Sequence, residues 1–200
     1  MDSTSGKFKD KYRITSARLK DWDYAFPGWY FITICTSERF LSFGEIRDGE
    51  VYRSPLGEIA RDYWLKIPDH FPNVALDEFI VMPNHLHGII GINAPVETPR
   101  DVRVETPRTV ETQHAASLRE NERNSLPKPG SISTIIRSYK SAVTRWAGQN
   151  GYESFSWQAR FYDRIIRDQQ ALAVVRAYIL ENPSQWVPDD YYSPKSENDQ

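Results

Sequence analysis

Two histidines separated by one residue are the side chains of this sequence with the clearest chemical potential. His85 and His87 follow a Pro-Asn turn and begin a mostly apolar run, 85–92, that is typical of a short buried strand. Side chains two positions apart on a strand point to the same face, so the imidazoles are expected side by side. Such a pair can bind one metal ion and leave much of its coordination sphere open, as in catalytic sites. The spacing alone is equally compatible with two hydrogen-bonded core histidines.

A tyrosine and an asparagine near the end of the chain form a second candidate pair. Tyr178 and Asn182 are four residues apart in a segment that is predicted to be helical, so they lie on one helical face, one turn from each other. In the plainer interpretation Tyr178 borders the core and Asn182 caps the helix before Pro183. The spacing leaves both interpretations open.

Composition limits the class of protein. The chain has 200 residues, enough for one domain with a substantial core, and a formal net charge of −2. The single cysteine, Cys35, excludes an intrachain disulfide framework and a cysteine-based zinc ribbon. The sequence has neither a signal peptide nor an apolar run of membrane length, so we expect a soluble cytoplasmic protein without membrane contact. Basic residues cluster in the first 20 positions, so the net charge says little about a local groove.

Hydrophobic periodicity predicts the elements that position these candidates. Strands are predicted at 29–36, 79–82, 85–92 and 155–166, with a hairpin at 45–52 around an Asp-Gly turn. Helices are predicted at 54–68, 131–148 and 168–182. This order predicts an α+β fold of the ferredoxin-like β-α-β-β-α-β type, an antiparallel sheet with helices on one face, followed by a C-terminal helix that carries Tyr178. The other sheet face is free to carry a site, toward which both histidines can point.

Three segments differ in composition from the predicted domain. Residues 1–26 are polar and basic and are interpreted as an N-terminal tail, and residues 188–200 as a polar C-terminal tail. Residues 94–129 contain a near-repeat rich in proline and alternating charge, which is typical of a disordered, low-complexity insertion. We therefore expect a single domain over 27–187, interrupted by the insertion at 94–129.

Three separated motifs together resemble a known family. They are Met82-Pro83-Asn84-His85-Leu86-His87-Gly88, then Trp157-Gln158 with Arg160-Phe161-Tyr162-Asp163, and finally Tyr178-Ile179 with Asn182-Pro183. In this order they resemble the single-tyrosine, His-hydrophobic-His (HUH) transposases. More narrowly, they resemble the REP-associated tyrosine transposases of the IS200-like group. The resemblance covers about 29–186 without the insertion.

The resemblance implies an enzyme that cleaves and rejoins single-stranded DNA at sites flanking hairpins, through a 5′-phosphotyrosine intermediate. It implies that Tyr178 is the nucleophile and that His85, His87 and Asn182 bind a divalent metal, Mg²⁺ or alternatively Mn²⁺. Many relatives carry Gln at the third ligand position, where this chain has the shorter Asn182. Such a metal would polarise the scissile phosphate toward a phenol that is otherwise a poor nucleophile at neutral pH.

The resemblance also implies a partner, single-stranded or hairpin DNA, and leaves open whether the protein is a monomer or a homodimer. Four basic residues are candidate phosphate contacts on the grounds of charge and position: Arg137, Lys140, Arg160 and Arg164. Two other functions stay open. One is a domesticated module that binds hairpin DNA or RNA without cutting it. The other is a metal hydrolase that uses water, which would need carboxylate ligands beyond the nearby Asp77 and Glu78.

Overall fold

The computed structural model describes residues 7–8, 11–12, 23–93 and 128–186. The predicted insertion and both predicted tails lie almost wholly outside these ranges, so their boundaries stay predictions. Two short strands, β1 (Lys7–Phe8) and β2 (Lys11–Tyr12), pair with each other near the start of the chain. All other described elements belong to one domain.

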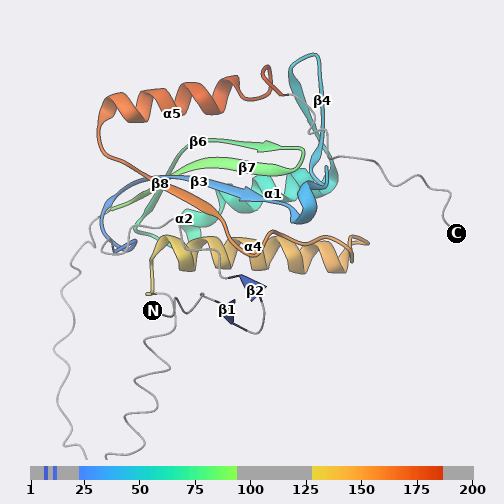
Figure 1. Cartoon of the computed structure of the whole chain (residues 1–200), viewed down its shortest axis with the longest axis horizontal. Coiled ribbons are helices and arrows are strands. Elements are labelled where there is room, and N and C mark those ends of the chain that lie inside the picture. Colours follow the sequence, from blue (N-terminus) through green and yellow to red (C-terminus); the bar gives the residue numbers. More distant parts are fainter. Residues whose placement is uncertain (1–6, 9–10, 13–22, 94–127, 187–200) are drawn as a thin grey trace, which may run out of the picture.

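A four-stranded antiparallel sheet forms the centre of the domain. Its strands are β3 (Gly28–Cys35), β6 (Val74–Met82), β7 (His85–Ile92) and β8 (Tyr162–Ile166), in the order β6-β7-β3-β8. Helices α1 (Pro55–Leu65) and α4 (Ile132–Gln149) cover one face, and α5 (Gln169–Glu181) crosses the other (Figure 1). This is the strand order of a ferredoxin-like fold, so the predicted fold class is confirmed.

The strand β7 alternates between two hydrophobic clusters. Leu86 and Ile90 belong to the main core beneath α1 and α4, whereas Ile89 belongs to a smaller cluster beneath α5. Strand alternation therefore places His85 and His87 on the face that α5 crosses. The same alternation in β3 turns Ile32 to the main core and Phe31 to α5.

Each main helix begins at a side chain that caps it. Ser54 Oγ accepts a hydrogen bond from the Gly57 N–H (3.1 Å), and Asp168 Oδ1 accepts one from the Ala171 N–H (2.7 Å). Ser131 caps α4 in the same way. The predicted hairpin is β4 (Gly44–Arg47) and β5 (Glu50–Arg53), joined by Asp48 and Gly49, which both have positive φ.

Two predicted boundaries are wrong. Helix α1 ends at Leu65, and Pro68 lies in the first turn of a separate short helix, α2 (Ile67–His70), because proline fits a helical first turn. The last strand begins at Tyr162, not near 155, and Trp157 before it makes only an isolated bridge to Thr36, beyond β3. The short 3₁₀ helix η1 (Ser37–Arg39) follows β3.

Gly88 permits a close approach between β7 and α1. A Cβ atom at this position would overlap the indole ring of Trp64, lie 2.9 Å from its Cε2 and 3.1 Å from Phe79 Cβ. Because the ring is fully buried and cannot move aside, Gly88→Ala should lower the free energy of unfolding by about 1–3 kcal/mol.

Urea denaturation would measure this effect, with Gly148→Ala as the matched control. A Cβ atom at Gly148, near the end of α4, would have no neighbour within 4 Å. That variant should be neutral or more stable by up to about 1 kcal/mol, because alanine favours a helix more than glycine does. Equal effects of the two substitutions would contradict the proposed overlap.

Candidate active site

The two histidines lie side by side at the end of the sheet where β6 turns into β7. His85 pairs with Cys35 and His87 with Thr33 across the ladder to β3. Their ring centroids are 4.5 Å apart, and the ring planes are inclined at 71°. His87 is buried, and His85 is half-buried at the rim of the sheet. The predicted side-by-side arrangement is therefore present.

Hydrogen bonds orient both imidazoles through the same nitrogen. His85 Nδ1 lies 2.6 Å from Asn84 Oδ1, which can only accept, so this nitrogen carries the hydrogen. His87 Nδ1 lies 2.8 Å from Thr33 Oγ1, which can accept in the same way. The Nε2 atoms of both rings are then unprotonated and can act as ligands, a common arrangement in metal-binding histidines.

Burial keeps both rings neutral. It lowers the pKa of His85 to about 4, with a further contribution from the positive charge of Arg39. Burial likewise lowers the pKa of His87 to about 3, and the neighbouring His85 adds to the effect. At neutral pH both imidazoles therefore keep a lone pair for a metal ion or a proton.

These lowered pKa values predict that acid destabilises the metal-free protein. Between about pH 4 and 6.5 the unfolded chain binds protons at His85 and His87 that the folded chain does not bind, so the free energy of unfolding rises with pH in this window. The contribution is complete above about pH 6.5 and decreases as the pH falls toward 4. From pH 7 to 4.5 the loss, summed over the two histidines, should be on the order of 5 kcal/mol.

Urea denaturation at a series of pH values would measure this loss, and a His85→Asn, His87→Asn double variant is the comparison. Asparagine does not titrate, so the variant should lose most of the pH dependence between 4.5 and 6.5. An unchanged slope in the double variant would mean that other groups cause the acid sensitivity.

Tyr178 extends from α5 to the histidine pair. Its Oη lies 3.3 Å from His87 Nε2, so the phenol can donate a hydrogen bond to the imidazole. The side chain is 46% exposed, so a substrate can reach the oxygen. Phe31 orients both partners, stacked on His87 at 5.3 Å and edge-on to Tyr178 at 6.0 Å between centroids. The structure thus brings Tyr178 and His87 together from segments 91 residues apart.

The donor set fits a divalent metal with an open coordination sphere. Two unprotonated Nε2 atoms on one sheet face can provide two ligands. The described residues contain no group of three His, Cys, Asp or Glu side chains that could hold a metal ion. A further ligand would have to be another donor type, and Asn182 is half-buried one turn beyond Tyr178, at the end of α5. Its ligand role stays a prediction.

An ion pair connects α5 to β6, an edge strand of the sheet. A bulge between Leu76 and Phe79 interrupts the ladder, and Asp77 lies in it. Arg176 Nε donates to Asp77 Oδ1 at 2.7 Å and Arg176 Nη2 to Asp77 Oδ2, a two-bond contact. These bonds lower the pKa of the Asp77 carboxyl group. Because Arg176 is two residues before Tyr178, the contact helps to set the position of the phenol.

Removal of this ion pair should loosen α5. Arg176→Ala leaves the mostly buried Asp77 carboxylate without its partner, and amide hydrogen exchange across 172–181 should become severalfold faster. Arg167→Ala, which removes an exposed arginine just before the same helix, should leave the exchange unchanged. Equal protection in both variants would show that the apolar contacts alone hold α5.

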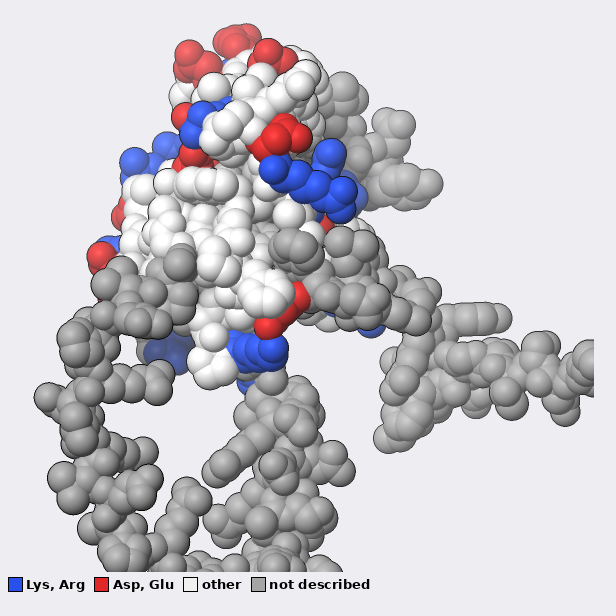
Figure 2. Space-filling view, turned by 90° about the vertical axis from the view of Figure 1, so that its left-hand side faces the viewer, with Lys and Arg blue, Asp and Glu red and all other residues white. Residues whose placement is uncertain are grey.

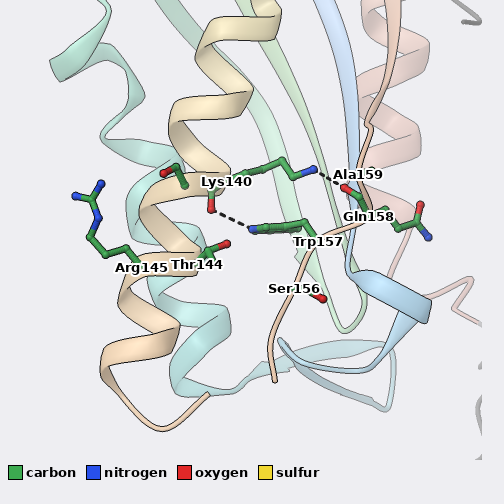
Figure 3. Close-up of a pocket in the computed structure, with 8 residues that line it drawn as sticks. Lys140, Thr144, Arg145, Ser156, Trp157, Gln158 and Ala159 are labelled. Atoms are coloured by element: carbon green, nitrogen blue, oxygen red, sulfur yellow. Dashed lines mark hydrogen bonds between the residues drawn. The ribbon is translucent and has the colours of Figure 1, made fainter. Parts of the chain in front are cut away.

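The four predicted DNA contacts lie on different parts of the molecule. Arg137 and Lys140 lie on α4, across the sheet from Tyr178 (Figure 1). Lys140 Nζ donates to the main-chain oxygens of Gln158 and, at 3.4 Å, of Arg160, while the Trp157 indole N–H donates to the Lys140 carbonyl at 3.2 Å (Figure 3). The Lys140 ammonium is thus held by the segment before β8. Arg164, which pairs with Phe31, faces the α5 side, and Arg160 is exposed in the segment before β8.

The charged surface does not form one basic field on the face shown in Figure 2. Lys and Arg side chains there lie in small groups between Asp and Glu side chains, around a largely uncharged middle, among the residues the structure describes. Contacts with a phosphate backbone on this face would therefore be made by single basic residues.

Sequence patterns did not identify several residues that shape the site. Thr33 and Phe31 lie beside His87 because of the register between β3 and β7, which depends on long-range pairing. Asp77 and Arg176 meet across 99 residues. Asn84 had a detectable signal, since it directly precedes His85 in the turn.

Known proteins resemble this chain both in sequence and in fold. It is 36% identical over 177 residues to a Haemophilus influenzae protein of uncharacterised function, covering 88% of this chain and 92% of that protein. The two belong to one family. No family model matches the chain. A solved REP-associated tyrosine transposase, bound in that structure to a REP hairpin, superimposes with a TM-score of 0.52 at 16% identity, over 86% of this chain and 76% of that one.

The chain has the fold of a REP-associated tyrosine transposase. The predicted likeness to the REP-associated tyrosine transposases is confirmed at the level of the fold. In this tyrosine transposase fold the candidate nucleophile and the histidine pair lie on the sheet face that α1 and α4 leave uncovered. Among the described residues, no helix is long and apolar enough to cross a membrane.

Proposed function

We propose that this protein cleaves and rejoins single-stranded DNA, with Tyr178 as the nucleophile and a divalent metal ion bound by His85 and His87. The observation that carries the proposal is the contact between Tyr178 Oη and His87 Nε2 at 3.3 Å. A nucleophile must lie within about 3–3.5 Å of the atom it attacks. Tyr178 Oη already lies beside the His87 nitrogen that would hold the metal ion, and hence beside the place where a metal-bound phosphate would lie. The transposase fold supports a DNA substrate.

Several residues of the chain would position the metal ion. Asn84 and Thr33 hold the imidazoles so that both Nε2 atoms face the site. A divalent ion there would supply Lewis acidity to a non-bridging oxygen of the scissile phosphate. Mg²⁺ is the expected ion, although two imidazoles suit Mn²⁺ better. Asn182 is the proposed third ligand.

The covalent step conserves the phosphate ester. The Tyr178 oxygen attacks the phosphorus, the bond from phosphorus to the 3′ oxygen breaks, and the phenolic proton is lost as the departing strand gains one to become a 3′-OH. A 5′-phosphotyrosine bond replaces the phosphodiester bond. Because the new bond is also a phosphate ester, a 3′-OH can attack it and rejoin strands without another energy source.

The alternative of a water-using metal hydrolase is disfavoured. Asp77, one of the two nearby carboxylates, is engaged by Arg176, and no cluster of three acidic, histidine or cysteine ligands occurs in the described part of the chain. The other alternative is a non-cleaving module that binds hairpin DNA or RNA, and an experiment must distinguish it from the proposed enzyme.

A strand-cleavage assay tests the proposal. Hairpin oligonucleotides with single-stranded flanks, taken from repeats beside the protein's own gene and labelled at each end in turn, would be incubated with Mg²⁺ or Mn²⁺. The proposal predicts one free 3′-OH product, one protein-linked 5′ product, and loss of both with a chelator. Binding without cleavage under either metal would overturn the proposed reaction and support the binding module.

A further inference from the structure

A groove of about 370 Å³ opens directly beside Tyr178. Phe31 and Thr33 of β3 and Tyr162 and Arg164 of β8 form its floor, while Val174, Val175 and Tyr178 of α5 form its wall. Cross-strand pairs place these floor residues on one face, since Thr33 pairs with Tyr162 and Phe31 with Arg164. Asp163 also borders the groove, but its side chain belongs to the opposite strand face.

The groove exists because α5 leaves part of the sheet uncovered. The ion pair between Arg176 and Asp77 holds the helix toward β6, at one edge of the sheet, while β8 is the other edge. Two large apolar or aromatic side chains therefore remain exposed at the mouth, Tyr162 and Val174, each 64% exposed. Both side chains are therefore accessible to a ligand beside Tyr178.

The groove's chemistry matches one nucleotide of a single strand. Tyr162 offers a π face for stacking, Val174 and Phe31 offer apolar contact, and the Thr33 hydroxyl is a polar group on the floor. Arg164 is exposed and makes no ion pair with any described carboxylate, so its guanidinium can contact a phosphate. The volume is at the lower end for small-ligand sites, which suits one base and excludes a duplex.

We propose that this groove binds the base of the nucleotide next to the scissile phosphate, stacked on Tyr162, with Arg164 on an adjoining phosphate. The inference rests on the proposed function, because Tyr178 defines which phosphate is attacked. The groove would require that this nucleotide be unpaired, since a base in a duplex cannot enter it. It would thus restrict cleavage to single-stranded flanks of a hairpin.

The test measures binding separately from cleavage. In a Tyr178→Phe background, 2-aminopurine would replace each base in turn along the flank of a hairpin oligonucleotide, and its fluorescence would report stacking. One position should be quenched on binding. Tyr162→Ala should remove that quenching and weaken binding about tenfold, whereas Tyr162→Phe should retain both, because the phenyl ring still stacks.

Two further variants make the test specific. Val174→Trp should fill the groove and also remove the quenching, while Tyr52→Ala, which truncates an exposed tyrosine on the separate β4–β5 hairpin, should have no effect. An abasic nucleotide at the quenched position should weaken binding to the parent but not to the Tyr162→Ala variant.

The outcomes distinguish the two proposals. Quenching that depends on Tyr162 supports the groove even if the protein with Tyr178 intact never forms an adduct, a result that would overturn the proposed function alone. Adduct formation by the parent, with quenching and affinity unchanged in Tyr162→Ala and Val174→Trp, would overturn the groove alone.

Discussion

Tyr178→Phe should abolish the covalent protein–DNA adduct, with a loss of at least about 10³-fold, and leave the fold and the DNA affinity close to those of the parent. The substitution removes only Oη, the atom that lies 3.3 Å from His87 Nε2. The ring keeps its edge contact with Phe31, so α5 should remain in place. Denaturing gel electrophoresis with labelled oligonucleotide measures the adduct, and filter binding measures the affinity.

Tyr162→Phe is the matched control for this prediction. Tyr162 borders the same groove and is 64% exposed, yet its ring faces the groove from β8, separate from the histidine pair. Its hydroxyl should be dispensable for adduct formation. An adduct that persists in Tyr178→Phe and disappears in Tyr162→Phe would show that Tyr162, and not Tyr178, is the nucleophile.

His87→Ala should remove metal-dependent cleavage, and His85→Ala should do so to a similar extent. Each variant leaves one imidazole and the proposed ligand Asn182, and two neutral ligands hold a divalent ion weakly. We expect Mn²⁺ affinity to fall by about 10- to 100-fold or more, because even the loss of an outer-shell partner has an effect of that size. Isothermal titration calorimetry with Mn²⁺ measures the affinity without DNA or cleavage.

His70→Ala provides the control for the histidine variants. His70 is exposed at the end of α2, on the helix-covered side of the molecule, and should affect neither Mn²⁺ binding nor cleavage. Thr33→Val should lower Mn²⁺ affinity less than His87→Ala does, since it removes only the hydrogen bond that orients His87. Mn²⁺ affinity that is unchanged in both His85→Ala and His87→Ala would place the metal elsewhere.

Local sequence patterns predicted the elements and the shared face of the two histidines. The apolar stripe from Ile132 to Val143 predicted α4, and Pro55 after Ser54 predicted the start of α1. The alternation in 85–92 predicted that Leu86 and His87 point to opposite layers, because the period of a strand is a property of neighbouring residues alone. The order of the predicted strands and helices predicted the ferredoxin-like fold.

The contact between Tyr178 and His87 could not be derived from local patterns. The side of the sheet on which α5 lies depends on the cluster of Ile89, Val175 and Ile179, and on a bulge that turns Asp77 toward Arg176. The roles of Thr33 and Phe31 depend on strand register. The role of Lys140 could not be predicted either. A basic residue on the polar face of a helix has the same sequence pattern whether it binds phosphate or, as here, main-chain oxygens.

The most direct test of the central claim is to identify the residue that carries DNA. The protein would be incubated with a hairpin oligonucleotide and Mn²⁺, digested with nuclease and protease, and the peptides would be sequenced by mass spectrometry. The proposed mechanism predicts a nucleotide attached through its 5′ phosphate to Tyr178, and to no other tyrosine, with the signal lost in His87→Ala. A nucleotide attached to a different residue, or cleaved DNA that is never attached to protein, would contradict it.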